Sequence, residues 1–465
     1  MDKFKTNTLF PIETINRELD FRLFLAVMAA NSSHRIFVGQ HNVLDKLIPY
    51  MKGGIYVGKT LFKTSFPTDL SYYRLLKKQG FSIVHLDEEG AFYAGDEDNW
   101  RRVLDIRLDP SVLKRDDFIC TWGDFQKKHY ISKNPELAQN IRVTGHPRFD
   151  LYKKIYRHYF EQEAKLIKEK YGHYILINTN LTTANNGFGL RITFSSQYGY
   201  LPKDQNKRMS VVRRWAQANH VLSNMVALIH RLSFEFPDFS IVVRPHPSEE
   251  QNFYRTVFSG VENIHVVHSG PVGHWIVAAE VLIHDGCTTA VEAYLADTQI
   301  ISFKPYENDQ ESFNLPNLLG NICSTEEKVV ALIKKIQAGE SIKWENNIGQ
   351  KEFGLFENFS SEAFKPVLNV IEEAQTKLSS NFKTPSLTTL RLMENSRQIK
   401  DVPKKVFRPF FSEKMANYRT CYNKFYGFDK KVIQQKMDLI QKMLDKSVNF
   451  SLISDSLMII DSKEQ

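Results

Sequence analysis

The feature that most constrains the fold of this chain is a repeated alternation of short apolar runs with stretches of helical periodicity. In the N-terminal half the apolar runs are TLFPI, RIFVG, GGIYV, FSIVHL and FICTWG, with a helix expected from about Leu19 to Ala30. Short apolar runs that alternate with helices are typical of parallel strands in α/β proteins. We therefore predict an α/β fold with parallel sheets.

The same alternation begins again after a charged helical stretch, EQEAKLIKEKYG, at residues 161–172. The later runs are YILINTN, FSIVVRPHP, NIHVVHSG, AEVLIHDG and TQIISFKP, with a long helix expected from about Val211 to Phe236. Because 465 residues are too many for one compact core, two domains are expected. We predict Rossmann-like domains at residues 1–165 and 166–375, facing a central cleft.

Beyond Glu373 no strand pattern remains, and basic segments such as KDVPKKVFRPFFSEK and FDKKVIQQKMDLIQKMLDK follow. We predict a basic helical tail at residues 376–465 that packs on the domains and binds anionic membranes in a salt-sensitive manner. In the alternative, its aromatic residues only pack on the first domain and its lysines are solvated. The residues concerned are Lys404, Lys405, Phe407, Arg408, Phe410, Phe411, Lys414, Tyr426, Lys430, Lys431 and Lys436.

The formal charge of +8 indicates an anionic partner: a phosphorylated substrate, an anionic bilayer or a nucleic acid. Acids alternate with the bases and no recognised nucleic-acid motif occurs, so we expect no nucleic-acid partner. No apolar run reaches the roughly 18–20 residues of a membrane span, and MDKFKTNTLFPIE lacks the layout of a signal peptide. We expect a cytoplasmic protein, with the inner face of the cytoplasmic membrane as a docking surface.

The four cysteines, Cys120, Cys287, Cys323 and Cys421, show no CxxC pair and no zinc-like histidine spacing. We expect reduced, mostly buried thiols, no cofactor and no metal requirement. The sequence also lacks a GxGxxG fingerprint after its first strand and a Walker phosphate loop, which disfavours dehydrogenases and ATPases.

The sharpest local pattern is VLIHDGCTTAVEAYLA, an apolar strand that ends in a polar turn and leads into a helix. Amides exposed at a helix start bind phosphate, and hydroxyl groups add donors. His284, Gly286, Thr288 and Thr289 are therefore candidates for binding a nucleotide. In the alternative, Thr288 only caps the helix.

Two further strand ends in the second half carry polar side chains. FSIVVRPHPSEE delivers Arg244, His246 and Ser248 to the end of a strand, and two prolines, among them Pro247, hold the turn. Arg244 and His246 are candidate phosphate or nucleotide contacts, and Pro247 belongs to the same candidate site. In YILINTNLTTANNGFG the strand ends in Asn178, Thr179 and Asn180, and the polar loop after them could close over a nucleotide. A satisfied structural histidine and an ordinary surface loop are the alternatives.

In the first half, FSIVHLDEEGAFY places Asp87, Glu88 and Glu89 after a strand, where a carboxylate could deprotonate an acceptor hydroxyl. A solvated acidic turn is the alternative. RVTGHPRFDLY places His146 and Arg148 just before the interdomain helix, where they either line the cleft or lock the hinge.

Together, TGHPRFD, VVRPHPSEE and HDGCTTAVEA resemble the family of bacterial surface carbohydrate biosynthesis proteins, and LFPIETINRELD and LDEEG extend the likeness over most of residues 8–375. An acidic-acidic-glycine motif paired with a His-Pro motif is also similar to bacterial sialyltransferases, polysialyltransferases and Kdo transferases. The two α/β halves look like the two-domain arrangement called GT-B. The opening segment adds Glu13 and Arg17 as candidate cleft residues.

This resemblance implies a glycosyltransferase of capsule or lipopolysaccharide biosynthesis, in which the first domain binds the acceptor and the second binds the nucleotide-sugar. The donor would carry a CMP-activated Kdo- or nonulosonate-type sugar, and the acceptor would be a glycan or lipid-linked glycan. The acidic motif would supply the general base, and the other two motifs would bind CMP. Matched residue by residue, these motifs fall on Glu88, Glu89 and Gly90, on His246 and Pro247, and on Thr288 and Thr289.

Two alternatives stay open. Polyol-phosphate transferases and UDP-GlcNAc 2-epimerases also carry a strand-end histidine and a Gly-Ser/Thr helix start, so a CDP-polyol phosphotransferase with a histidine base is one. A non-catalytic polysaccharide-assembly factor without nucleotide affinity is the other. The donor sugar, the linkage and the stereochemistry are not decided by the sequence.

Overall fold

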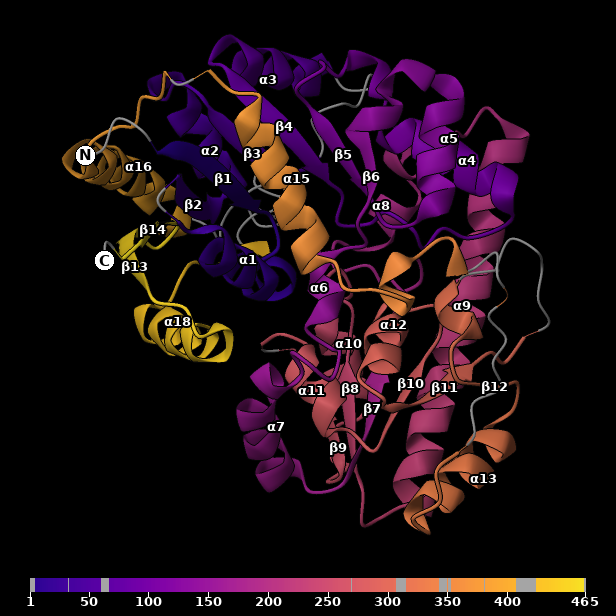
Figure 1. Ribbon diagram of the computed structural model, residues 1–465. Helices are drawn as coiled ribbons and strands as arrows, with labels where there is room; N and C mark the ends of the chain where they lie inside the picture. Colours follow the sequence, from indigo (N-terminus) through magenta and orange to yellow (C-terminus); the bar gives the residue numbers. More distant parts are fainter. Residues whose placement is uncertain are drawn as a thin grey trace. The chain divides into compact units, whose positions relative to one another are not determined.

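The computed structural model describes residues 5–31, 33–59, 67–268, 270–306, 315–342, 349, 353–379, 381–406 and 424–463, with the backbone alone at 67–70 and 401–406. The chain forms two compact units. Unit 1 comprises residues 1–91, 101–151 and 353–465, and unit 2 comprises residues 92–100 and 152–352. Figure 1 labels the elements of both.

Unit 1 is built on an eight-stranded sheet in the order β13-β14-β2-β1-β3-β4-β5-β6. The strands β1 to β6 are mutually parallel. Without the hairpin, their order 2-1-3-4-5-6 is a doubly wound one. The strands are β1 Thr6–Ile12, β2 His34–Gln40, β3 Gly54–Gly58, β4 Phe81–Leu86, β5 Phe118–Thr121 and β6 Ile141–Val143.

Helices cover this sheet because their apolar faces match its buried strands. Helix α1, Ile15–Ala29, is buried on almost every side, including the charged Glu18 and Arg22. The other helices of unit 1 are α2 His41–Leu47, α3 Pro67–Lys78, α5 Asp124–Lys133, α6 Pro147–Asp150, α15 Phe364–Thr376, α16 Leu387–Val406 and α18 Lys430–Leu444, while α4 Glu97–Arg107 begins in unit 2.

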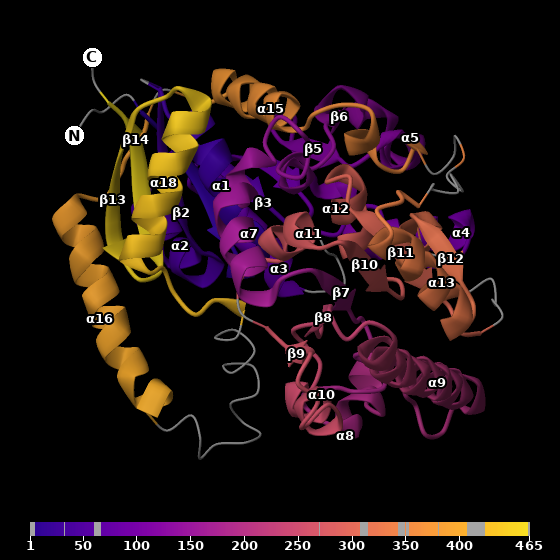
Figure 2. The same cartoon turned by 90° about the horizontal axis from the view of Figure 1, so that it is seen from below.

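The C-terminal part is helical as predicted, but the prediction that strands stop after Glu373 is wrong. Strands β13 Val448–Ser454 and β14 Leu457–Ser462 form a hairpin, and β14 pairs antiparallel with β2. Figure 2 shows α16 beside this hairpin. The sequence pattern missed this hairpin, although its strands are apolar: β14 begins with four buried apolar residues, LMII.

Unit 2 is built on a six-stranded parallel sheet in the order β12-β11-β10-β7-β8-β9. Counted from the first strand of the unit, this is the 3-2-1-4-5-6 order of a Rossmann fold. The predicted α/β fold with two Rossmann-like domains is therefore confirmed. The strands are β7 Tyr174–Asn178, β8 Ser240–Arg244, β9 Ile264–Val266, β10 Val281–His284, β11 Gln299–Phe303 and β12 Asn321–Cys323.

The long helix α9, Gln205–Glu235, buries Met225, Leu228, Ile229 and Leu232 against this sheet. It begins earlier than predicted because Asp204 accepts a hydrogen bond from the Lys207 amide and caps the helix. The remaining helices of unit 2 are α7 His158–Tyr171, α8 Leu190–Thr193, α10 Gln251–Val257, α11 Gly273–Ala278, α12 Thr289–Leu295 and α13 Glu326–Gln337.

The two units do not follow the predicted ranges. Helix α7 lies in unit 2, whereas the sequence pattern predicts that residues up to 165 belong to the first domain. Helix α15 lies in unit 1, where it crosses β3 and β4 (Figure 1). The carboxylate of Asp150 accepts hydrogen bonds from the Ala363 and Phe364 amides at the start of α15, which ties the returning chain to unit 1.

Cys120, Cys287 and Cys323 are free and buried, as expected, and Cys421 lies outside the described residues. Among the described residues, no helix combines the length and apolar character that crossing a bilayer requires.

Candidate functional site

The strand order of unit 2 reverses direction between β7 and β10. Ligands of open α/β sheets bind at the carboxyl ends of the strands beside such a switch point. Here Asn178 ends β7 and pairs in register with His284, which ends β10. Two residues predicted from separate motifs therefore lie side by side at this position.

The switch point carries polar atoms that the described part of the chain leaves unsatisfied. His284 is completely buried, and neither of its ring nitrogens has a hydrogen-bond partner among the described residues. Burial and the positive charge of Lys304 lower the pKa of His284 to about 3, so the ring is neutral. The Asn178 side-chain oxygen has no partner in the described ranges either. Such groups usually bind a ligand or an ordered water.

The turn after β10 is already held in shape by side chains of unit 2. Asn317 accepts a hydrogen bond from the Gly286 amide at 2.6 Å, and φ of Gly286 is +66°. The Thr289 hydroxyl donates to Cys287 Sγ at 3.1 Å and accepts from the Asn178 amide at 3.0 Å. Thr288 is exposed and its side chain makes no capping hydrogen bond, so of the two threonines Thr288 presents its hydroxyl outward.

Asp285 and Lys304 add charge beside this turn. Burial raises the pKa of Asp285 to about 6, against the opposing effect of Lys304 and of the hydrogen bond from Tyr306. Burial likewise lowers the pKa of Lys304. Both residues follow strands, β10 and β11, so the same rule of polar strand ends could have identified them.

The second His-Pro motif forms a turn after β8. His246 Nδ1 accepts a hydrogen bond from the Ser248 amide at 3.2 Å, so in the neutral ring the proton lies on Nε2. Glu249, which the sequence analysis missed, is buried in the same turn and accepts hydrogen bonds from Thr179, the Leu181 amide and Tyr254. Burial raises its pKa.

The other candidates of unit 2 lie in different surroundings. Arg244 is buried, donates to the Gly270 carbonyl at 2.9 Å and lies 4.9 Å from the centroid of the Trp275 ring. Pro247 and Asn180 are exposed. Arg244 therefore stabilises the loop before α11, in contrast to His246 on the same strand end.

In unit 1 the strand order reverses between β1 and β3, and charged side chains meet there. Glu13 follows β1 and Lys59 follows β3, with 2.9 Å between Lys59 Nζ and Glu13 Oε2. Burial would raise the pKa of Glu13, but Lys59 and Lys424 hold it at about 2. Arg17 lies 3.3 Å from Glu18 and 3.2 Å from Glu89, which links this site to the acidic motif.

Within the acidic motif, Glu88 is buried between two partners. Its Oε1 lies 3.2 Å from Arg22, and its Oε2 lies 3.3 Å from Nε2 of His146. His146 Nδ1 accepts from the Arg148 amide, so Nε2 carries the proton that faces Glu88. Burial would raise the pKa of Glu88, but His146, Arg22 and Lys59 hold it well below its usual range. Burial lowers the pKa of His146 to about 4.

Glu89 lies in the opposite environment, with 59% of its side chain exposed. Its carboxylate pairs with Arg17 at 3.2 Å and with Arg107 at 3.3 Å, and Arg107 also pairs with Asp87. Burial would raise its pKa, but Arg17 and Arg107 lower it, so Glu89 is ionised at neutral pH. Of the three acids in the motif, Glu89 is the most exposed to solvent.

Gly90 is required by packing. A Cβ atom at this position would lie 2.4 Å from the Trp122 indole, whose Nε1 donates to the Asp87 carbonyl at 2.7 Å. Arg148 is also buried in unit 1, 4.4 Å from the Phe149 ring centroid. Arg148 and His146 therefore pack inside unit 1.

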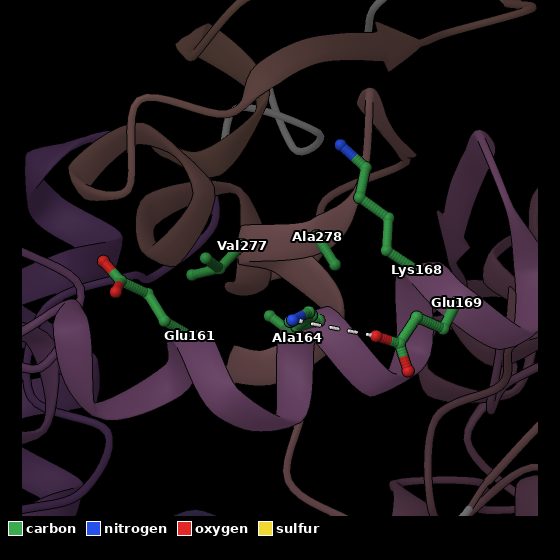
Figure 3. Close-up of a pocket in the computed structure, with 7 residues that line it drawn as sticks. Glu161, Ala164, Lys168, Glu169, Val277 and Ala278 are labelled. Carbon is green, nitrogen blue, oxygen red and sulfur yellow. Dashed lines mark ion pairs between the residues drawn. The ribbon is translucent and has the colours of Figure 1, made fainter.

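A cavity of about 450 Å³ lies elsewhere, between α7 and α11 of unit 2 (Figure 3). It is lined mainly by Glu161, Ala164, Lys168, Val277 and Ala278, none of which is a candidate site residue. Ala278 precedes β10, so this cavity lies near the amino end of that strand, away from the switch point. Within the described ranges, no three His, Cys, Asp or Glu side chains are grouped so that they could hold a metal ion.

No model of a protein family matches the sequence, and no curated protein matches it. The fold is similar to the UDP-GlcNAc 2-epimerase from Neisseria meningitidis bound to UDP-GlcNAc, with 13% identity over 80% of this chain and 100% of the other and a TM-score of 0.42. It is similar to a putative UDP-N-acetylglucosamine 2-epimerase from Listeria monocytogenes, with 12% identity, 83% and 100% coverage and a TM-score of 0.45. It is also similar to the wall teichoic acid polymerase TagF, with 11% identity over 81% of this chain and 90% of the other and a TM-score of 0.47. Identities and TM-scores this low carry no argument about substrate or reaction.

Proposed function

We propose that this chain is a nucleotide-sugar-dependent glycosyltransferase of bacterial surface-polysaccharide biosynthesis. In this proposal a CMP-activated Kdo- or nonulosonate-type sugar is transferred to a glycan or lipid-linked glycan acceptor. The observation that carries it is the switch point of unit 2, where His284 and Asn178 are buried with polar atoms that lack partners in the described chain. This is the position at which a Rossmann sheet binds a nucleotide.

His246 is the proposed phosphate contact. Because the Ser248 amide donates to Nδ1, the neutral ring presents an Nε2–H that can donate to a phosphate oxygen. Thr288, with its outward hydroxyl, is the second donor. Donors of this kind stabilise the negative charge that develops on the departing nucleotide.

Glu89 is the proposed general base for the acceptor hydroxyl. It is ionised and reached by solvent, whereas Glu88 is enclosed by Arg22 and His146. A base must come within hydrogen-bond reach of the proton that it removes. The surroundings of the two acids therefore favour Glu89.

A CDP-polyol phosphotransferase remains the second candidate, and it requires a histidine base. The Nδ1 hydrogen bond of His246 disfavours this role, because Nε2 of the neutral ring then carries the proton and cannot accept another. We also propose that transfer needs no metal ion, so that EDTA leaves turnover unchanged.

For the basic tail, the proposed membrane contact depends partly on residues whose side chains lie outside the described part of the chain. These residues are Lys404, Phe407, Arg408, Phe410, Phe411 and Lys414.

A panel of nucleotides tests the proposal. We expect CMP or CDP to raise the melting temperature at saturation, since a ligand at one hundred times its Kd stabilises by about 2.7 kcal/mol. A shift with UDP but none with cytidine nucleotides would overturn the CMP-donor assignment. No shift with any nucleotide would favour a non-catalytic assembly factor.

A further inference from the structure

The most concentrated positive charge in the described chain lies in unit 2, on the segment from α8 to the first turns of α9. We call residues 190–214 the α8–α9 surface. It contains six cations and one acid, Asp204, and thus a net charge of +5, against +8 for the whole chain. The cations are Arg191, Lys203, Lys207, Arg208, Arg213 and Arg214, and all six are exposed.

This surface has a defined shape because a small aromatic cluster supports it. The Phe194 ring lies 5.5 Å from Tyr200 and 5.6 Å from Trp215 of α9, between ring centroids. The Arg214 guanidinium donates to the Tyr198 carbonyl at 3.2 Å, which ties the α8 segment to the helix. In Figure 2 α8 lies beside α9. The cations are therefore presented on a folded scaffold.

Large apolar side chains are exposed among these cations. Leu190 is 46% exposed, Tyr198 47%, Leu201 36% and Met209 37%. A soluble polyanion would attract the cations but would offer nothing to these four side chains. An anionic bilayer satisfies both, since cations bind its headgroups and apolar side chains enter the boundary with the acyl chains.

We propose that the α8–α9 surface docks unit 2 on an anionic lipid bilayer. The net positive charge of this surface attracts it to the anionic headgroups, and the four apolar side chains insert into the boundary with the acyl chains. The described lysines of the predicted membrane tail are partly engaged inside unit 1, where Lys436 pairs with Asp20 at 2.7 Å and Lys446 donates to the Met28 carbonyl. This docking is independent of the donor nucleotide, and it adds a contact that the composition of the tail did not predict.

Flotation of the full-length protein with vesicles tests the proposal. Vesicles of phosphatidylcholine mixed with phosphatidylglycerol should bind the protein, and pure phosphatidylcholine should not. The triple variant Lys203→Glu, Arg208→Glu, Arg213→Glu should lose roughly a hundredfold in affinity, because each cation near an anionic surface contributes roughly a factor of five. The double variant Leu201→Ser, Met209→Ser should lose roughly tenfold, since each buried methylene contributes roughly 0.8 kcal/mol and only part of each side chain inserts.

Two matched variants complete the design. Lys154→Glu, Lys165→Glu, Lys328→Glu changes the charge of exposed unit 2 residues equally without touching the surface, and it should bind more tightly than the test triple. Lys430→Glu, Lys431→Glu, Lys442→Glu makes the same change on α18. Melting curves establish that each variant is folded. Equal losses in the test and unit 2 control triples, or full binding by the test triple, would overturn the proposal. So would retained affinity in the apolar variant, because binding would then follow charge alone.

Discussion

The two His-Pro turns of this chain have the same local geometry and opposite surroundings. In unit 1, His146 Nδ1 accepts the Arg148 amide at 3.2 Å, and in unit 2, His246 Nδ1 accepts the Ser248 amide at the same distance. Each turn follows a parallel strand and contacts a buried glutamate. His146 is fully buried, and its Nε2 is directed at Glu88. His246 is half-buried, and its backbone amide donates a hydrogen bond to Glu249.

The difference lies in which end of the histidine the glutamate binds. Where the carboxylate faces Nε2, the ring is part of a packed network with Arg22 and can do no chemistry on a ligand. In unit 2 the carboxylate of Glu249 binds the backbone amide of His246 and not its ring. The same motif is therefore part of the packed interior in unit 1, and in unit 2 it carries the proposed phosphate contact.

The largest expected effect concerns the acid that unit 1 leaves accessible. Glu89→Gln should reduce transfer by roughly 10²–10⁴-fold, because an amide cannot accept the acceptor's proton. The binding of nucleotide should be unchanged, since the proposed nucleotide contacts lie in unit 2. Turnover and nucleotide dissociation constants measure the two quantities separately.

Glu89→Asp is the matched control and should restore part of the turnover, because it keeps a carboxylate. Near-normal transfer by Glu89→Gln would make the acidic motif structural. The melting temperature should change little, because exposed ion pairs contribute about 1 kcal/mol or less.

The next effect is on stability. His146→Ala should lower the free energy of unfolding by roughly 3–5 kcal/mol, because it opens a cavity between Phe21 and Trp122 and leaves Glu88 Oε2 without its partner. His246→Ala should cost about 1 kcal/mol. Urea unfolding of the two variants compares them directly, and equal losses would contradict the contrast between the turns.

The same contrast predicts a pH dependence. Burial lowers the pKa of His146 from 6.5 to about 4, so as the pH falls below 6.5 the unfolded chain takes up a proton before the folded one does. The contribution of His146 is complete above pH 6.5 and is lost towards pH 4, at most about 3 kcal/mol. The lowered pKa values of His34 and His284 also make stability fall as the pH falls, so the effect of His146 is measured as the difference between the parent protein and a variant. His146→Gln should show a shallower loss of stability over this range than the parent protein, and identical slopes would refute the assignment.

Much of the fold could be predicted because buried parallel strands are recognisable in the sequence as short apolar runs. Ten of the strand positions followed from this pattern, and the structure places the polar ends of two of these strands, Asn178 and His284, side by side. The pattern failed for β6 and β12, which are only three residues long, and it was overlooked in the apolar hairpin of β13 and β14, which follows a basic helical stretch. It also failed for Phe353 onwards, because the return of α15 to unit 1 depends on Asp150, far away in sequence.

The candidate site was less predictable for a related reason. The alternation of a strand end indicates that Glu88 and Glu89 face opposite ways, but only the partners show which one is buried. Arg22, which binds Glu88, lies in the middle of an apolar helix and carries no motif. Glu249 lies in the PHPSEE segment, but its burial depends on Thr179 and Tyr254 from other elements.

The smallest of the expected effects tests the exposed turn itself. His246→Ala should weaken nucleotide binding by roughly ten- to a hundredfold, since a hydrogen bond to a charged group contributes roughly 1.5–3 kcal/mol. His246→Asn is the matched variant, because an amide can still donate to phosphate and should retain part of the affinity. Calorimetric titration with CMP or CDP measures both. If His246→Ala binds as tightly as the parent protein while turnover falls, the histidine acts in the reaction and the polyol-phosphotransferase alternative gains support. If neither binding nor turnover changes, His246 is a structural residue like His146, and the contrast between the two turns has no functional meaning.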